Sequence, residues 1–209
     1  MARRLNDYPE IIVQAGNLCE PVDFENIFGR AGAVHIEIGS GKGTFLISQA
    51  KAQPEVNFLG IEWARKYCRF AVDRIGRWGI KNVKLIRTDA ADFIIRFVPD
   101  SSVACYHIYY PDPWPKKRHH KRRFICTANM EHLLRTLEPG GVIQIATDHI
   151  DYFEQIKNTL AQKKDVLEPV EFMPPAGAEN GETVGTNFER KYIKQSRNVY
   201  TAAVRKKTN

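Results

Sequence analysis

The chain has 209 residues, and a hydrophobic content of 43% is sufficient for the core of one large domain or two small ones. Its 31 Lys and Arg residues against 24 Asp and Glu residues give a formal net charge of +7, which favours a polyanionic partner. No apolar run reaches membrane-spanning length, and the amino terminus shows no apolar signal segment, which argues against membrane contact and secretion. We therefore expect a cytoplasmic protein.

The four cysteines are widely scattered and form no Cys-x-x-Cys pair. This spacing predicts reduced thiols, with neither a disulfide framework nor a zinc site. His119 and His120 are further metal-ligand candidates, but adjacent histidines in a basic segment are more typical of RNA or solvent contacts. We therefore expect no metal.

Apolar runs alternate with helical patterns through most of the chain. The runs predict strands at 34–38, 57–61, 83–86, 103–110 and 142–146, and a closing strand at 198–204. The intervening patterns predict helices at 44–53, 64–77, 90–97, 130–137 and 152–161. Residues 171–187, rich in Pro, Gly and Asn, predict a flexible loop. Without a linker in this pattern, we expect 1–209 to form a single α/β domain that includes an amino-terminal segment at 1–32. The alternation predicts a doubly wound, mainly parallel sheet with helices on both faces.

Acidic residues follow the predicted strands one after another. Ligands of such sheets bind beyond the carboxyl ends of the strands. Each acid taken alone can be explained as a helix cap, but five in series around a glycine loop indicate a binding site. The five acids are Glu37, Glu62, Asp89, Asp112 and Asp148.

The glycine loop reads Gly39-x-Gly41-x-Gly43. It matches neither the dinucleotide pattern Gly-x-Gly-x-x-Gly nor the nucleoside triphosphate loop. Preceded by Glu37 and followed by Glu62 after the next strand, it suits S-adenosylmethionine. Glycines permit close approach of the backbone, and a carboxylate such as Glu62 can accept from both ribose hydroxyls. Asp89 is placed to accept from the adenine amine, and Glu37 lies near the amino-acid end of the cofactor.

A second conspicuous segment begins where the strand at 103–110 ends. Asp112 lies between two prolines, Trp114 follows, and the next eight residues, 116–123, contain six Lys or Arg and two His. This combination suggests a base-modifying site with a phosphate-binding segment attached. A solvated basic loop or a localisation tract is the alternative explanation.

Several of these motifs together resemble the bacterial tRNA (guanine-N7)-methyltransferase family. They are 37–43, Gly60-Ile61-Glu62, 111–123, Ala146-Thr147-Asp148 and 186–189, and the segment 111–123 is highly specific to that family. The resemblance implies a class I, Rossmann-like methyltransferase fold with a seven-stranded sheet, S-adenosylmethionine as donor, and a variable-loop guanine of tRNA as acceptor.

By motif position, the resemblance also implies roles for individual residues. Asp112 becomes the catalytic residue. The cofactor contacts become Glu37, Gly39, Gly41, Gly43, Glu62, Asp89 and Asp112. The substrate contacts become Lys116, Arg118, His119, His120, Lys121, Arg122, Arg123, Asp148, Thr186, Asn187, Phe188 and Glu189. The expected partner is tRNA, with no obligatory protein partner, and the protein is expected to be a monomer or a homodimer.

The chemistry of guanine N7 agrees with these residues. N7 has an in-plane lone pair, so no base has to remove a proton before methylation. Asp112 is therefore expected to position the base and stabilise the positive charge that develops on it. Because adenine also has an N7, the Watson–Crick edge of guanine must be read, and Asp148 or Glu189 can accept from its two donors. The alternative for Glu189 is a cap or an ion pair with Arg190 or Lys191.

Two rival functions remain open at this stage. An exocyclic-amine methyltransferase would carry Asp/Asn-Pro-Pro-aromatic at this strand end, where this chain has Pro-Asp-Pro-Trp. A non-catalytic RNA-binding protein on the same fold would be expected to have a degraded cofactor loop. Here Glu37, three glycines, Glu62 and Asp89 are all present.

Overall fold

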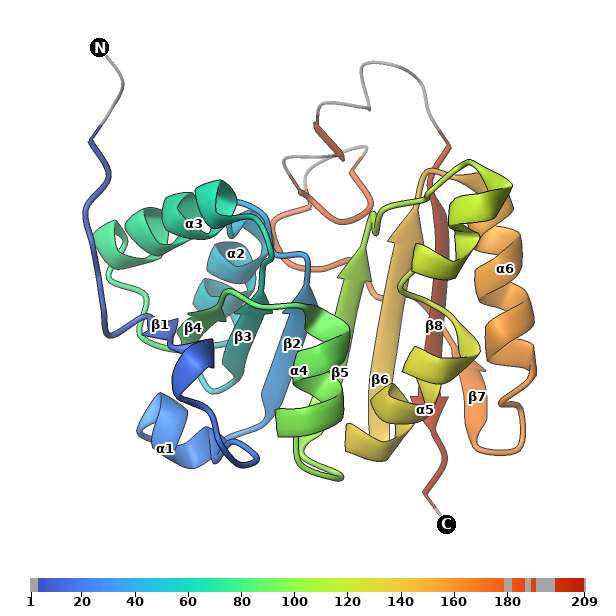
Figure 1. Ribbon diagram of the computed structural model, residues 1–209, viewed down its shortest axis with the longest axis horizontal. Coiled ribbons are helices and arrows are strands. Elements are labelled where there is room, and N and C mark those ends of the chain that lie inside the picture. The colour runs from blue at the N-terminus through green and yellow to red at the C-terminus, as the bar shows by residue number, and fades with distance from the viewer. Residues whose placement is uncertain (1–3, 179–181, 187–188, 191–197, 209) are drawn as a thin grey trace.

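The computed structural model describes residues 4–178, 182–186, 189–190 and 198–208. Over these residues the chain forms one sheet of eight strands in the order β1-β4-β3-β2-β5-β6-β8-β7 (Figure 1). The strands are β1 (Ile12–Val13), β2 (Val34–Ile38), β3 (Asn57–Ile61), β4 (Val83–Ile86), β5 (Val103–Tyr109), β6 (Leu137–Thr147), β7 (Leu167–Val170) and β8 (Tyr200–Lys206). Strands β1 to β6 pair in parallel, and β8 pairs antiparallel with β6 and β7. The predicted, mainly parallel sheet is confirmed.

The expected number of seven strands is wrong by one. Two strands lie outside the predicted runs, β7 and the edge strand β1. Strand β1 comes from the amino-terminal segment, where Ile12 and Val13 pair with Leu85 and Ile86 of β4. A strand of two residues is too short to show alternation of apolar and polar side chains, so no pattern in the sequence indicates it.

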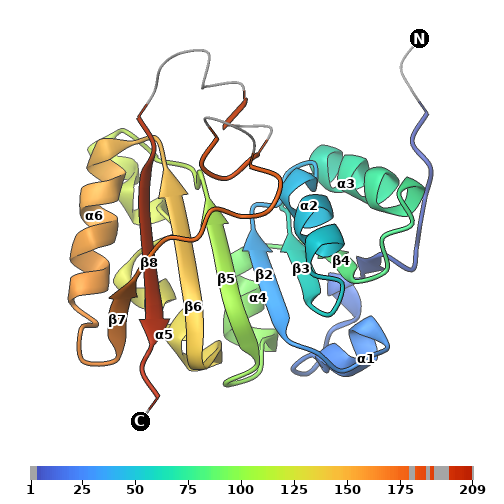
Figure 2. The same cartoon turned by 180° about the vertical axis from the view of Figure 1, so that it is seen from behind.

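The helices cover both faces of the sheet, as predicted. They are α1 (Phe24–Phe28), α2 (Thr44–Ala52), α3 (Arg65–Arg77), α4 (Ala90–Phe97), α5 (Thr127–Thr136) and α6 (Ile150–Ala161), with 3-10 helices η1 (Ala15–Asn17) and η2 (Lys117–Arg122). Helices α4, α5 and α6 lie in front of the sheet in Figure 1, whereas α2 lies on the side turned to the viewer in Figure 2. No helix of the described chain has the length and apolar character needed to cross a membrane.

The boundary between α5 and β6 differs from the prediction. The helix was expected at 130–137 and the next strand at 142–146, yet α5 ends at Thr136 and β6 begins at once with Leu137. Leu137 pairs with Val103, and the next partners are Val142 and Cys105, so β6 holds extra residues against β5. Gly140, with a φ of 80°, lies in this irregular stretch. Pro139-Gly140-Gly141 therefore forms a bulge inside the strand rather than a turn before it.

The core has two parts because successive side chains of a strand point to opposite faces. On one face, Ile36, Leu59 and Tyr106 pack with residues of α1, α4, α5 and α6. On the other face, Phe58 and Leu85 pack with residues of α2 and α3. The apolar residues of β2 that precede the glycine loop, Ile36 and Ile38, pack on the first face.

Substitution of Gly60 can test how closely β3 packs against α2. A Cβ at this position would lie 2.5 Å from Leu46 Cδ1 and 2.6 Å from Leu85 Cδ2. We predict that Gly60→Ala lowers the free energy of unfolding by ~1–3 kcal/mol, because an overpacked core has to shift. Urea unfolding measures this change. Gly16→Ala, where a Cβ would meet no atom within 4 Å, is the control, and equal decreases in both variants would contradict the prediction.

Candidate active site

The strand order reverses between β2 and β5, because β3, β4 and β1 lie on one side of β2 while β5 and β6 lie on the other. An open parallel sheet binds its ligand beyond the carboxyl ends of the strands at such a switch point. The loop after β2 carries the three glycines, and the loop after β5 carries Asp112. The parallel pairing of β2 with β5 therefore brings two predicted parts of the site to one edge.

The three glycines of the loop serve different purposes. Gly39, Gly41 and Gly43 have φ values of 78°, 54° and 69°, which side chains with a Cβ rarely adopt. A Cβ on Gly43 would lie 3.1 Å from the Cβ of Ala71, so this glycine allows α3 to pack closely. A Cβ on Gly39 would meet nothing within 4 Å. Gly39 therefore presents its backbone to open space, where a ligand can approach.

Glu62 holds the glycine loop against the start of α3. One of its carboxylate oxygens accepts from the backbone N–H of Gly41 and the other from that of Ala64, each at 2.7 Å. The side chain is buried, but each oxygen retains a second lone pair that ribose hydroxyls can use. The sequence predicted that Glu62 binds the ribose. Its second role, holding the glycine loop against α3, becomes visible only in the fold.

Glu37 is the most unusual group of this edge. It is 5% exposed, and its Oε2 has no hydrogen-bond partner among the described residues. Burial, and then the charge of Glu62, raise the pKa of Glu37 to about 8. The buried Oγ of Ser40 also has no partner among these residues. A buried acceptor without a donor lowers the stability of the fold. Glu37 Oε2 and Ser40 Oγ together therefore fit a ligand with a cationic donor, such as the ammonium group of S-adenosylmethionine.

Asp89 and Asp112, the two other predicted cofactor contacts, are exposed. Asp89 caps α4 and accepts from the backbone N–H of Asp92 at 2.9 Å, in agreement with the helix-cap explanation. Asp112 has no hydrogen bond or ion pair to any described residue. It lies between Tyr110 and Trp114, whose φ values of 51° and 42° are strained for residues with a Cβ. Strain of this kind is consistent with a loop shaped for function.

The basic segment after Asp112 is an ordered 3-10 helix, η2. His119 and His120 are half-buried, and the ring of Trp114 contacts both the guanidinium of Arg122, at 4.9 Å, and the ring of His119, at 5.8 Å. Trp114 therefore packs against the basic helix. The remaining predicted contacts are exposed and available to phosphates: Lys116, Arg118, Lys121 and Arg122.

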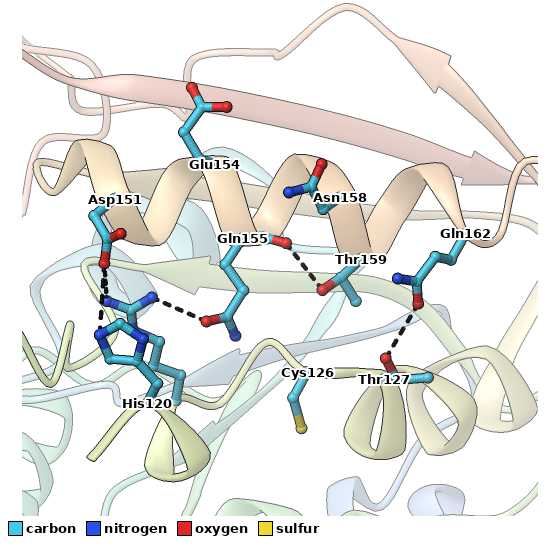
Figure 3. Close-up of a pocket in the computed structure, with 10 residues that line it drawn as sticks. His120, Cys126, Thr127, Asp151, Glu154, Gln155, Asn158, Thr159 and Gln162 are labelled. Carbon is cyan, nitrogen blue, oxygen red and sulfur yellow. Dashed lines mark hydrogen bonds and ion pairs between the residues drawn. The ribbon is translucent and has the colours of Figure 1, made fainter. Parts of the chain in front are cut away.

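Arg123 does not belong with these exposed cations, and its assignment as an RNA contact is wrong. Only 2% of it is exposed. Its guanidinium donates to Pro113 O at 2.8 Å, to Gln155 Oε1 at 2.9 Å and to the carboxylate of Asp151. Figure 3 shows Asp151 and Gln155 on one side of α6, turned toward η2. Arg123 therefore anchors the Asp112 loop and the basic helix to α6.

Glu189 is likewise committed to the structure. It is 2% exposed, and its carboxylate accepts from the backbone N–H groups of Thr183, Val184 and Gly185. Burial and Glu189 together raise the pKa of Tyr110, which directly follows β5. These hydrogen bonds support the capping explanation for Glu189. Its contact with the guanine edge stays a prediction.

The other predicted contacts of this region divide as follows. Thr186 Oγ1 accepts from the backbone N–H of Glu189 at 3.1 Å, so it supports the same loop. Asn187 and Phe188 lie outside the described residues. Asp148, half-buried after β6, acts on the pKa of Tyr110 and therefore lies near the end of β5. Asp148 remains the candidate for reading the guanine edge.

A polar cluster on the α2 face was not predicted. His107 Nε2 lies 3.2 Å from His35 Nδ1, and His107 Nδ1 lies 2.9 Å from the hydroxyl of Tyr109. With Cys105, the two histidines form a group of metal-ligand type whose ligand atoms all lie within 4.8 Å of one another. Spacing along the chain cannot reveal such a group, because its members come from two strands. Burial lowers the pKa of His107, which keeps this interior network neutral.

The raised pKa of Glu37 predicts a pH-dependent stability. The folded chain keeps this proton up to a pKa of about 8, whereas the unfolded chain loses it near 4.5, so the carboxyl lowers stability as pH rises through this window. We expect Glu37→Gln to raise the melting temperature at pH 8 and to leave it nearly unchanged at pH 4.5. Calorimetry at both values measures the difference. The control is Glu154→Gln, which replaces an exposed glutamate. If Glu37→Gln changed the melting temperature equally at both pH values, titration of Glu37 would not be the cause.

Arg123 and its neighbour Arg122 offer a matched comparison. We predict that Arg123→Gln lowers the melting temperature by several degrees, because it leaves the Pro113 carbonyl and Gln155 without a donor. Arg122→Gln removes the same charge from an exposed position and should leave the melting temperature within about one degree. Similar melting temperatures for the two variants would contradict the anchoring role.

Known proteins place the chain in a family. Residues 31–202 match the model of a family described as putative methyltransferase. The tRNA (guanine-N(7)-)-methyltransferase of Alkalilimnicola ehrlichii is 34% identical over 90% of this chain and 78% of its own length. That of Myxococcus xanthus is 34% identical over 89% of both chains. The solved 16S rRNA methyltransferase KamB, at 13% identity, matches 90% of this chain and 95% of its own with a TM-score of 0.67, which supports the class I methyltransferase fold. The chain belongs to the tRNA (guanine-N7)-methyltransferase family.

Proposed function

We propose that the protein transfers the methyl group of S-adenosylmethionine to N7 of a variable-loop guanine in tRNA. Its relatives carry the name of this activity. The observation that carries the proposal is the buried oxygen of Glu37, which has no partner among the described residues and lies at the edge shared by the glycine loop and Asp112. We further propose that the protein works in the cytoplasm as a single domain, monomeric or homodimeric, without an obligatory protein partner.

Different residues around the switch point are assigned to different groups of the cofactor. We assign the ammonium group of S-adenosylmethionine to Glu37 and the ribose hydroxyls to Glu62, whose oxygens still have free lone pairs. Asp89 is assigned to the adenine amine. Gly39 offers open backbone next to these acids. S-adenosylmethionine, when bound, supplies a methyl group on a positively charged sulfur. A nitrogen lone pair can attack the methyl carbon, and the sulfur is the leaving group.

Asp112 is assigned to the acceptor side of the reaction. The N7 lone pair of guanine forms the new bond to carbon as the bond between carbon and sulfur breaks. No proton is transferred, and positive charge moves onto the guanine ring. A fixed carboxylate next to the ring stabilises this charge and holds N7 in line. The exposed position of Asp112 in a strained loop suits contact with a base that enters from outside.

Selection of guanine falls to Asp148 in this proposal. Guanine offers two donors on its Watson–Crick edge, N1–H and the 2-amino group, and one carboxylate can accept both. Glu189 is occupied by backbone donors, whereas Asp148 lies at the end of β6 beside the end of β5. The exposed cations of η2, with His119 and His120, are assigned to tRNA phosphates, which position the RNA without reading its sequence.

The activity is tested directly with a tRNA transcript and S-adenosylmethionine. Mapping of N7-methylguanine should show one modified position in the variable loop. Replacement of that guanine by adenine should abolish methylation. Methylation on an exocyclic amine, or binding of tRNA without methyl transfer, would overturn the proposal in favour of a rival function.

Asp112 provides the sharpest prediction for the chemical step. We expect Asp112→Ala to lower the single-turnover rate by ~10²–10³-fold at saturating tRNA and donor, because the variant has no preorganised charge where positive charge develops. The affinity for tRNA should change by less than about threefold, since phosphate contacts supply most of it. Asp100→Ala, an exposed acid at the opposite end of β5, is the control. A near-normal rate would remove Asp112 from the catalytic machinery.

A further inference from the structure

A second basic feature lies at the same edge of the sheet, away from η2. A pocket of about 530 Å³ is formed between the amino-terminal segment and α3. Its basic lining consists of Arg65 and Arg69 from the first turns of α3 and Arg87, which directly follows β4. Gln14, which follows β1, lines it from the other side. Carboxyl ends of parallel strands thus place this pocket on the edge that carries the candidate active site.

The charges of this pocket are not balanced within the described chain. All three arginines are exposed, and none has a hydrogen bond or an ion pair to a described residue. Asp7 is the one acidic residue among the described residues that line the pocket. Three guanidinium groups around one hollow repel one another, and an anion between them would remove this repulsion.

The opposite end of α3 shows that the lack of partners is local. There Arg77 forms an ion pair with Asp73 at 2.8 Å, and Arg74 donates to Lys42 O and Thr44 Oγ1. The arginines at the carboxyl end of the helix are therefore used by the fold. Those at its amino end are left for a ligand.

The pocket is adjacent to the proposed cofactor site. Cys68 lines the pocket, and both Glu62 and Arg87 act on the pKa of its thiol. The pocket therefore lies on the β4 side of Glu62, whereas η2 follows β5 on the other side of the switch point. A long polyanion laid along this edge can contact both basic features at once.

We infer that Arg65, Arg69 and Arg87 form a second phosphate-binding site for the backbone of the substrate tRNA. This inference rests on the proposed function and adds to it a contact on the far side of the cofactor. A macromolecular phosphate is favoured over a small free anion because the arginines are exposed at the edge rather than enclosed. Contacts on both sides of the switch point fix the direction of the RNA across Asp112.

The test compares two triple variants that remove the same charge. The first is Arg65→Gln with Arg69→Gln and Arg87→Gln. The control is Arg96→Gln with Lys157→Gln and Arg205→Gln, three exposed residues on α4, α6 and β8. Binding of tRNA is measured at several salt concentrations, and binding of S-adenosylmethionine is measured by calorimetry.

We expect the pocket variant to bind tRNA at least ~10-fold more weakly at low salt than the control variant. The slope of log affinity against log salt should fall by ~0.7–0.9 for each phosphate that the variant no longer neutralises. KM for tRNA should rise while kcat and the affinity for S-adenosylmethionine stay unchanged. Because the three arginines have no described partners, the melting temperature should not fall. Should the triple variant fail to fold, Arg87→Gln alone is expected to lower the slope by ~0.7–0.9.

Three outcomes would overturn the inference. One is an equal salt slope for the pocket and control variants. Another is an unchanged tRNA slope together with binding of inorganic phosphate or pyrophosphate that the three substitutions abolish, which would assign the pocket to a free anion. The third is abolished S-adenosylmethionine binding, which would assign the arginines to the cofactor. If wild-type protein itself binds no tRNA, the proposed function fails as well, so the two failures are distinguishable.

Discussion

The parallel pairing of β2 with β3 on one side and β5 on the other is the constraint on which the site depends. It reverses the strand order at β2 and places the ends of these strands on one edge. Helices on both faces then leave that edge as the place where loops can meet a ligand. The glycine loop, Glu62 and Asp112, which are far apart in the sequence, come together for this one geometrical reason.

Two buried ionisable side chains near this edge, Arg123 and Glu37, differ in whether the fold supplies their partners. Arg123 donates to Pro113, Asp151 and Gln155, so it stabilises the loop that carries Asp112. Glu37 has an oxygen without a described donor and a raised pKa, so it weakens the ligand-free fold. A residue that destabilises a structure is retained where it serves a ligand, because selection acts on function above a stability threshold. The contrast therefore assigns Arg123 to the structure and Glu37 to ligand binding.

The basic residues likewise fall into a structural group and an exposed group. Lys206 donates to Leu134 O and Leu137 O, and Arg135 donates to Ile94 O and Val98 O, so both are part of the scaffold. The exposed cations of η2 and of the arginine pocket have a polyanion as their natural partner. The net charge of +7 indicates such a partner but cannot show which cations meet it. Only burial and hydrogen bonding make that distinction.

The sequence by itself determined the alternation of strands and helices, the glycine loop and the acids at strand ends, because these follow from local periodicity and turn chemistry. It also determined the family, through short motifs in fixed order. Tertiary structure decided the extra strand β1, the bulge in β6 and the roles of Arg123 and Glu189. Arg123 meets its partners Asp151 and Gln155 at separations of 28 and 32 residues, and no local pattern encodes such a contact. Whether a charged side chain binds RNA or holds the fold depends on what distant segments place beside it, and that is a property of the folded chain alone.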